Sequence, residues 1–215
     1  MFGHGDVGFF DRIAPLYDVF MPPTLPEDLR AGLAFAHRPV ERVVDLGGGT
    51  GRASRTLRQL DVEAAVFDYS GGMLRRAREE GVPAVRADAA RLPVRDASLD
   101  AVVVTDALHH FPDPEAALRE VARALAPGGV VVIREFDPGT RRGRALAALE
   151  SLAGMDSRFL RPRELTGRLE DAGLRGHVVD PGFGYTVVGV RPSDGPVDGA
   201  SGEGDVPATD EERGR

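Results

Sequence analysis

The chain has 215 residues, enough for one domain with a buried core, and it has no cysteine, which excludes disulfides, thiolate metal sites and a cysteine nucleophile. Its net charge of −7 lies mainly in residues 193–215, and the absence of an arginine-dense segment argues against a nucleic-acid partner. All 27 basic residues are arginine, which excludes a lysine Schiff base and leaves codon bias and salt adaptation as open explanations.

The start of the chain carries no targeting signal that we can identify. MFGHGDVGFF lacks a basic start followed by an apolar stretch, and no run of about 18 apolar residues occurs anywhere. We therefore expect no secretory signal, no membrane insertion and a cytoplasmic location. The oligomeric state stays open.

Residues 1–38 are expected to form an N-terminal lid or cap. The stretch 9–20 is aromatic-rich and interrupted by Pro15, and 24–37 has the apolar spacing of a helix. Thr24 and Glu27 stand at capping-box spacing at the start of that helix.

From residue 40 short apolar runs alternate with helical patterns. The helix expected at 114–126 should stop at Pro127-Gly128-Gly129. Strands that alternate with helices predict a parallel sheet covered on both faces. The expected strands are 40–46, 64–68, 83–87, 99–105 and 130–134, and the expected helices are 51–60, 70–80 and 114–126.

The last third of the chain predicts a helix within 137–157, a helix at 162–172 and strands at 175–180 and 185–191. The four residues between these strands can only reverse the chain, so the pair is expected to be antiparallel. The fold class is therefore α/β, with a doubly wound, seven-stranded Rossmann-like sheet that is mostly parallel and ends in an antiparallel hairpin. The core spans 39–192, and the acidic tail 193–215 is expected to be disordered.

A glycine-rich turn follows the first strand, where open α/β sheets bind ligands. Gly47, Gly49 and Gly51 let a ligand lie on the backbone, and the helix that follows points unpaired N–H groups toward it. A dinucleotide fingerprint needs Gly-x-Gly-x-x-Gly, whereas the spacing here is Gly-x-Gly-x-Gly. Asp45, two residues earlier, would repel a pyrophosphate but attract an ammonium or sulfonium group.

This stretch resembles motif I of the class I S-adenosylmethionine-dependent methyltransferases, and the later segments match that family in order over about residues 9–191. The resemblance implies S-adenosylmethionine as cofactor. It implies that Asp68 accepts hydrogen bonds from the ribose hydroxyls and that Tyr69 and Met73 lie against the ribose and adenine. It further implies that Asp88 accepts from the adenine amino group and that the Ala89 N–H donates to the ring.

The N-terminal FFDRIAPLYD also resembles the ubiquinone/menaquinone biosynthesis branch, where such a segment closes over the cofactor. By that match Tyr17 would reach the site, although it could equally be a buried aromatic of the cap. The implied activity is methyl transfer to the oxygen, nitrogen or carbon of a small-molecule acceptor, with a quinone-type precursor as one option.

The loop after the fourth strand is the place for a catalytic base. His109 and His110 stand there, either as base or as packing residues, and we expect their side chains to point in opposite directions. Asp106 is expected to contact the methionine part of the cofactor through its backbone. Arg134 and Glu135 are further candidates at the rim, and the spacing of histidines and acids predicts no metal site.

Two other functions stay open at this point. A non-catalytic protein that binds S-adenosylmethionine would show binding without turnover. An NAD(P)-dependent Rossmann oxidoreductase would bind a nicotinamide cofactor instead, and the glycine spacing and the terminal hairpin argue against it.

Overall fold

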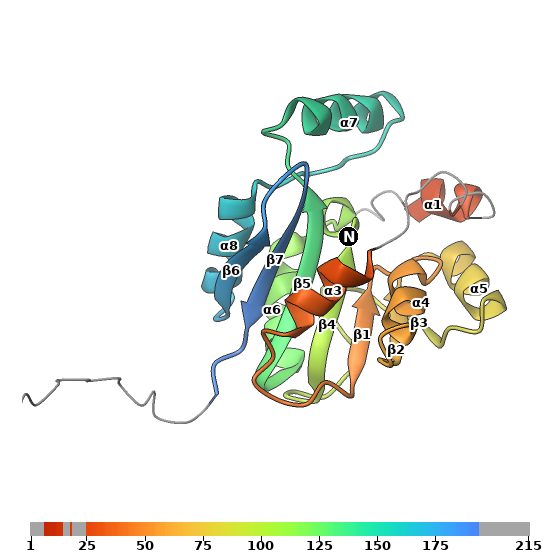
Figure 1. Ribbon diagram of the computed structural model, residues 1–215. Coiled ribbons are helices and arrows are strands. Elements are labelled where there is room, and N and C mark those ends of the chain that lie inside the picture. Colours follow the sequence, from red (N-terminus) through yellow and green to blue (C-terminus); the bar gives the residue numbers. More distant parts are fainter. Residues whose placement is uncertain (1–6, 15–17, 19–24, 194–215) are drawn as a thin grey trace, which may run out of the picture.

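The computed structural model describes residues 7–14, 18 and 25–193. Tyr17 and residues 194–215 lie outside these ranges. The described strands form one sheet in the order β3-β2-β1-β4-β5-β7-β6 (Figure 1). The strands are β1 Val43–Leu46, β2 Ala64–Asp68, β3 Ala84–Arg86, β4 Leu99–Thr105, β5 Leu125–Phe136, β6 Arg175–Asp180 and β7 Gly184–Val190.

Strands β1 to β5 pair in parallel, and β7 is antiparallel to both of its neighbours, β5 and β6. The predicted fold class, including the terminal hairpin, is confirmed. Because β1 lies between β2 and β4, the chain order reverses there, and a crevice is expected outside the carboxyl ends of these strands.

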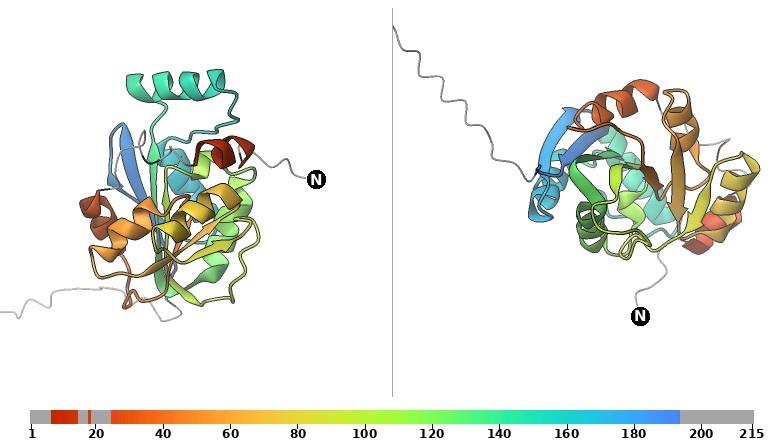
Figure 2. Two further views of the ribbon diagram at one scale, coloured as in Figure 1. Left: turned by 90° about the vertical axis from the view of Figure 1, so that its right-hand side faces the viewer. Right: turned by 90° about the horizontal axis from the view of Figure 1, so that it is seen from below.

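Helices cover both faces of the sheet (Figure 2). Leu29 and Leu57 pack on one face, and Leu118 and Leu165 pack on the other; all four are fully buried. None of the helices in the described part of the chain is long and apolar enough to cross a membrane. The helices are α1 Val7–Ile13, α3 Pro26–Leu33, α4 Arg52–Arg58, α5 Gly71–Glu79, α6 Pro114–Ala124, α7 Arg141–Leu152 and α8 Pro162–Asp171, with a 3₁₀ turn η1 at Leu108–His110.

Helix α3 belongs to the core, although residues 1–38 were expected to form a lid. It packs against β5, where Gly32 lies against Val132 because a Cβ would collide with that side chain. The predicted capping box is also wrong, because Leu25 is the N-cap and makes no side-chain cap bond. Only α1, of the two described N-terminal helices, reaches the crevice.

Strand β5 is longer than predicted and includes the expected stop signal. It begins at Leu125, which pairs with Leu99, and the ladder resumes at Val130 opposite Ala101 after a register shift. Gly129 permits this, since a Cβ there would lie 2.9 Å from the Asp100 carbonyl oxygen. The helix therefore ends at Ala124, before the Pro-Gly-Gly stretch, and that stretch lies within the strand.

Candidate active site

The turn between β1 and α4 has backbone angles that side chains rarely tolerate. Gly47, Gly49 and Gly51 have φ angles of +67°, +56° and +82°, in the region open mainly to glycine. A Cβ on Gly47 would approach the Phe111 ring to 3.0 Å, and one on Gly49 would lie 3.8 Å from the Met73 sulfur. The turn therefore leaves room for a ligand directly on the backbone.

Asp45 lies beneath this turn and does not line the crevice, which corrects the expectation that its carboxylate faces the ligand. Its Oδ2 accepts hydrogen bonds from the Ser54 N–H at 3.0 Å and from the Ser54 hydroxyl at 2.8 Å. A Cβ on Gly48 would collide with the Asp45 carboxyl group. Burial raises the Asp45 pKa to about 6, and its role is to brace the turn.

A cavity of about 430 Å³ opens at the carboxyl ends of β1, β2 and β4, within the roughly 300–1,000 Å³ typical of small-molecule sites. Gly51 is absent from its wall, because it caps α4 and faces Val82. The wall brings together most of the predicted residues: Gly47, Gly49, Asp68, Tyr69, Met73, Asp88, Ala89, Asp106 and His110.

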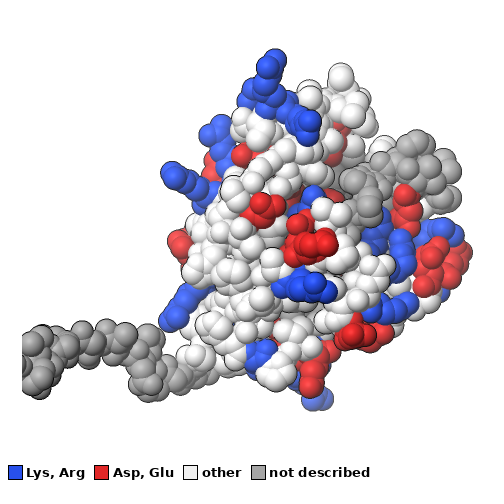
Figure 3. Space-filling view, in the orientation of Figure 1, with Lys and Arg blue, Asp and Glu red and all other residues white. Residues whose placement is uncertain are grey.

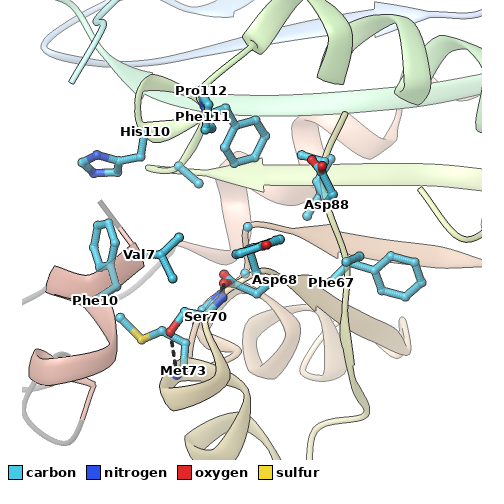
Figure 4. Close-up of a pocket in the computed structure, with 18 of the residues that line it drawn as sticks. Val7, Phe10, Phe67, Asp68, Ser70, Met73, Asp88, His110, Phe111 and Pro112 are labelled. Carbon is cyan, nitrogen blue, oxygen red and sulfur yellow. Dashed lines mark hydrogen bonds between the residues drawn. The ribbon is translucent and has the colours of Figure 1, made fainter. Parts of the chain in front are cut away.

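Asp68 ends β2 in the middle of this wall (Figure 4). Its Oδ2 accepts from the Gly49 N–H at 2.9 Å and its Oδ1 accepts from the Ser70 N–H at 2.7 Å. Burial raises its pKa, and these backbone hydrogen bonds oppose the rise. Since each carboxylate oxygen has two acceptor positions, Asp68 can still receive donors from a ligand.

The two ends of the cavity differ in chemistry. In Figure 4 His110 and Phe10 face each other at one end, Asp88 lies at the other, and Asp68 lies between them. The centres of the His110 and Phe10 rings are 4.8 Å apart, in an edge-to-face arrangement. Asp88 accepts from the Ala90 N–H at 2.9 Å. A ligand with a polar ring at the Asp88 end would therefore direct its far end toward His110.

His109 is buried behind the cavity wall, which corrects its place among the predicted site residues. Its Nδ1 lies 2.6 Å from Glu135 Oε2 and its Nε2 lies 3.9 Å from Glu150 Oε1. Burial lowers the His109 pKa, but the nearby carboxylates of Glu135 and Glu150 raise it by a larger amount, so the net shift is upward. Burial likewise raises the Glu135 pKa, but the contact with His109 lowers it overall. The pair is a buried ion pair.

The two histidine rings lie side by side, contrary to the expectation that they diverge. Their centres are 4.0 Å apart because both belong to the 3₁₀ turn η1. One donor atom each from His109, His110 and Glu150 lie within 4.8 Å of one another. The spacing of histidines and acids in the sequence did not predict this group, because Glu150 comes from α7, far along the chain from the two histidines.

Asp106 holds a strained position at the end of β4, with φ of +52°. Its Oδ1 accepts from Arg134 Nη1 at 3.1 Å, and its Oδ2 lies 3.6 Å from Arg52 Nη2. Burial raises the Asp106 pKa, and the charge of Arg134 opposes that rise. Arg134 and Glu135 were predicted at the rim, but Arg134 pairs with Asp106 and Glu135 pairs with His109.

Several residues of the wall were not predicted. Arg52 follows the last motif glycine directly, and that position was a usable signal. Val7 and Phe10 come from α1 and Phe111 from the loop after β4, and the sequence does not reveal the contacts of either segment. Tyr17 is outside the described residues, so its predicted role stays a prediction.

Comparisons with known proteins agree with this geometry. A family model described as a methyltransferase domain matches residues 44–133. The demethylmenaquinone methyltransferase of Mycobacterium sp. (strain KMS) is 35% identical over 154 residues, which cover 69% of this chain and 67% of that protein. The enzyme of the same name from Beutenbergia cavernae is 38% identical over 140 residues, covering 62% of this chain and 58% of the relative.

Solved structures share the fold. A methyltransferase from Thermotoga maritima, described as a possible histamine N-methyltransferase, has a TM-score of 0.68 and 23% identity, covering 86% of this chain and 98% of that one. DhpI, in a structure described as a DhpI-SAM-HEP complex, has a TM-score of 0.67 and 26% identity, covering 89% of this chain and all of DhpI.

Proposed function

The chain belongs to the class I S-adenosylmethionine-dependent methyltransferases, in the branch of the demethylmenaquinone methyltransferases, and from this premise we propose that its methyl acceptor is a quinone-type ring. It is an enzyme that uses S-adenosylmethionine, so neither the oxidoreductase nor the purely binding role stands. The observation that carries the acceptor is the 35% identity to a relative named for that reaction.

The proposed cofactor contacts follow the wall of the cavity. Asp68 holds the ribose hydroxyls, with Tyr69 and Met73 against the ribose and adenine. Asp88 and the Ala89 N–H face the adenine edge at the opposite end from His110. The glycine turn supports this proposal because a side chain at Gly47 or Gly49 would enter the cavity.

Arg52 joins this set as the partner of the cofactor's carboxylate. Its side chain is nearly buried in the wall, at the N-terminus of α4, where both the guanidinium and the helix dipole favour an anion. Asp106 lies 3.6 Å from it and would face the cofactor's ammonium group. A zwitterionic amino acid fits this pair of opposite charges.

When bound, S-adenosylmethionine supplies an activated methyl group on its sulfonium sulfur. The chain's own residues orient the reactants and exclude water. We assign the base to His110, which lines the cavity and lies 3.4 Å by Nδ1 from the Ser157 hydroxyl. It would take the proton of the acceptor, which makes the ring more nucleophilic. Helix α1 would cover this end as a lid, and Asp11 supports this role by attaching α1 to the start of α5, where it accepts from the Ser70 hydroxyl and the Gly72 N–H.

The acceptor end of the cavity is apolar, as an aromatic ring requires. Val7 and Phe10 of α1 face Phe111 and Pro112 of the loop after β4. The proposed compartment is the cytoplasm, and the proposed partners are small molecules, with no nucleic acid.

The test is transfer of labelled methyl groups from the cofactor to demethylmenaquinol. We expect a labelled, lipid-extractable product with the wild type, and at least several-fold less of it with an Asp68→Ala variant when the cofactor is below saturation. Labelling of another small molecule from a cell extract, with no labelled quinol, would overturn the acceptor and leave the methyltransferase activity standing.

A further inference from the structure

Helix α7 exposes a short stripe of apolar residues to solvent. Ala145, Ala148, Leu149 and Leu152 share one side of the helix, at the spacing of 3.6 residues per turn, and all are exposed. Leu149 is 64% exposed and Leu152 is 87% exposed. Apolar residues exposed in such a stripe mark an interaction surface more often than scattered ones do.

The opposite side of α7 fixes this orientation. Gly143 is buried against the Asp137 carbonyl, and a Cβ there would collide with it. Glu150 is also buried, facing His109. If the helix turned its leucines inward, Gly143 and Glu150 would both lose these buried contacts. The outward stripe is therefore a consequence of specific packing.

Arginines flank the stripe. Arg141, Arg142 and Arg144 are exposed, and helical spacing places Arg142 and Arg144 on its two sides. Between positions 141 and 163 the chain has six arginines and two acidic residues, although the whole chain has a net charge of −7. Figure 3 shows arginine side chains gathered beside uncharged surface at the top of the molecule, where α7 lies in Figure 1.

The stripe lies close to the acceptor end of the cavity. The segment after α7 returns to the cavity wall, where the Arg158 N–H donates to the His109 carbonyl at 2.7 Å and Phe159 stacks on the His109 ring. Both α7 and α1 lie at the carboxyl end of the sheet (Figure 1). Helix α7 therefore lies on the same side of the molecule as the acceptor end of the cavity.

We propose that α7 lies flat on the surface of an anionic lipid bilayer, with Leu149 and Leu152 among the acyl chains and the flanking arginines at the lipid phosphates. Exposed leucines beside Arg142 and Arg144 allow apolar contact with acyl chains together with ionic contact with lipid phosphates. The proposal rests on the quinone-type acceptor, because a ring with a long apolar tail resides in the bilayer and would enter from there.

A second copy of this chain fits the stripe less well. An isologous contact of α7 with α7 would bring six guanidinium groups into one small interface. The only acidic residue of the helix, Glu150, is buried and cannot pair with them. Anionic headgroups supply the opposite charge that the helix itself lacks.

The test is co-sedimentation of the full chain with vesicles of phosphatidylcholine, with and without phosphatidylglycerol. We expect binding to the anionic vesicles, weakened at least about tenfold by Leu149→Ser/Leu152→Ser. Arg141→Gln/Arg142→Gln/Arg144→Gln should remove the preference for anionic lipid. The control is Leu25→Ser/Val178→Ser, which removes exposed apolar side chains outside α7 and should bind as the wild type does.

Equal binding by the wild type and the Leu149/Leu152 variant would overturn the proposal, as would no binding to either vesicle. A dimer in sedimentation equilibrium that the same variant dissociates would assign the stripe to a second copy instead. Methylation of a quinol with a short, water-soluble tail should be unchanged in this variant. If neither the wild type nor any variant methylates the short quinol, the proposed quinone-type acceptor is wrong. The vesicle experiment still decides whether α7 binds lipid.

Discussion

The two ends of the parallel sheet treat buried aspartates in opposite ways. At the amino end, Asp100 is the second residue of β4 and accepts from the Arg42 N–H at 2.8 Å and from its guanidinium at 2.8 and 3.1 Å. Arg38 adds an ion pair at 2.8 Å. Burial raises the pKa of Asp100, but the hydrogen bonds and charge of Arg42 and the Glu41 N–H outweigh it and hold the pKa at about 2.

At the carboxyl end, burial prevails. It raises the pKa values of Asp68 and Asp106, and backbone N–H groups or more distant arginines only oppose the rise. Asp100 is thus saturated by guanidinium groups. Asp68 is instead held in place by backbone N–H groups and keeps acceptor positions facing the cavity, at a cost in stability.

The largest expected effect concerns the carboxyl end of the sheet, where His110 is the proposed base. His110→Ala should lower kcat about 10²–10⁴-fold, the usual contribution of a general base, with cofactor affinity little changed. His177→Ala, on β6, is the matched control and should leave kcat unaltered. Steady-state kinetics with isothermal titration of the cofactor measures both quantities. A normal kcat for His110→Ala would remove it as the base.

At the amino end of the sheet, a substitution should change the stability of the protein and leave cofactor binding unaltered. Asp100→Asn should lower the free energy of unfolding by about 2 kcal/mol at neutral pH, without changing cofactor affinity. Because the folded pKa is about 2 and the ordinary value is 3.8, the contribution is present above pH 4 and is lost as the pH falls toward 2. Urea titrations of both proteins should therefore converge as the solution is acidified. A constant difference across this range would contradict the ionic origin.

The ligand end should respond chiefly in affinity. Asp68→Ala should weaken cofactor binding at least about tenfold, because two charge-assisted hydrogen bonds are lost. Asp68→Asn, which keeps the shape and one acceptor oxygen, should lose less. Calorimetric titration with S-adenosylhomocysteine gives both values, and unchanged affinity in the alanine variant would show that Asp68 is not the ribose partner.

The smallest expected effect concerns metal. Glu135 Oε2 already lies 2.6 Å from the Nδ1 of His109, and the proposed catalysis assigns no step to a metal ion. Treatment with EDTA should leave kcat and the melting temperature unchanged. A loss of activity that zinc or magnesium restores would instead make His109, His110 and Glu150 a metal site.

The sequence alone determined the layout of the core and much of the site. Apolar runs broken by glycine and proline located β2 and β4 at their observed bounds, because buried parallel strands need continuous apolar residues. The glycine turn and the acids that end or follow the strands predicted the cavity wall, since parallel strands bring their carboxyl ends to one edge.

Only the tertiary structure decided contacts between segments distant in the chain. Glu135 and Glu150 enclose His109 from β5 and α7, which leaves His110 to face the cavity. Asp45 matches the sequence motif, but its side chain lies beneath the glycine turn and accepts a hydrogen bond from the Ser54 hydroxyl. The outward face of α7 was hidden likewise, because periodicity shows that a helix has an apolar side but not where that side points. Such choices depend on packing partners, and local sequence does not encode them.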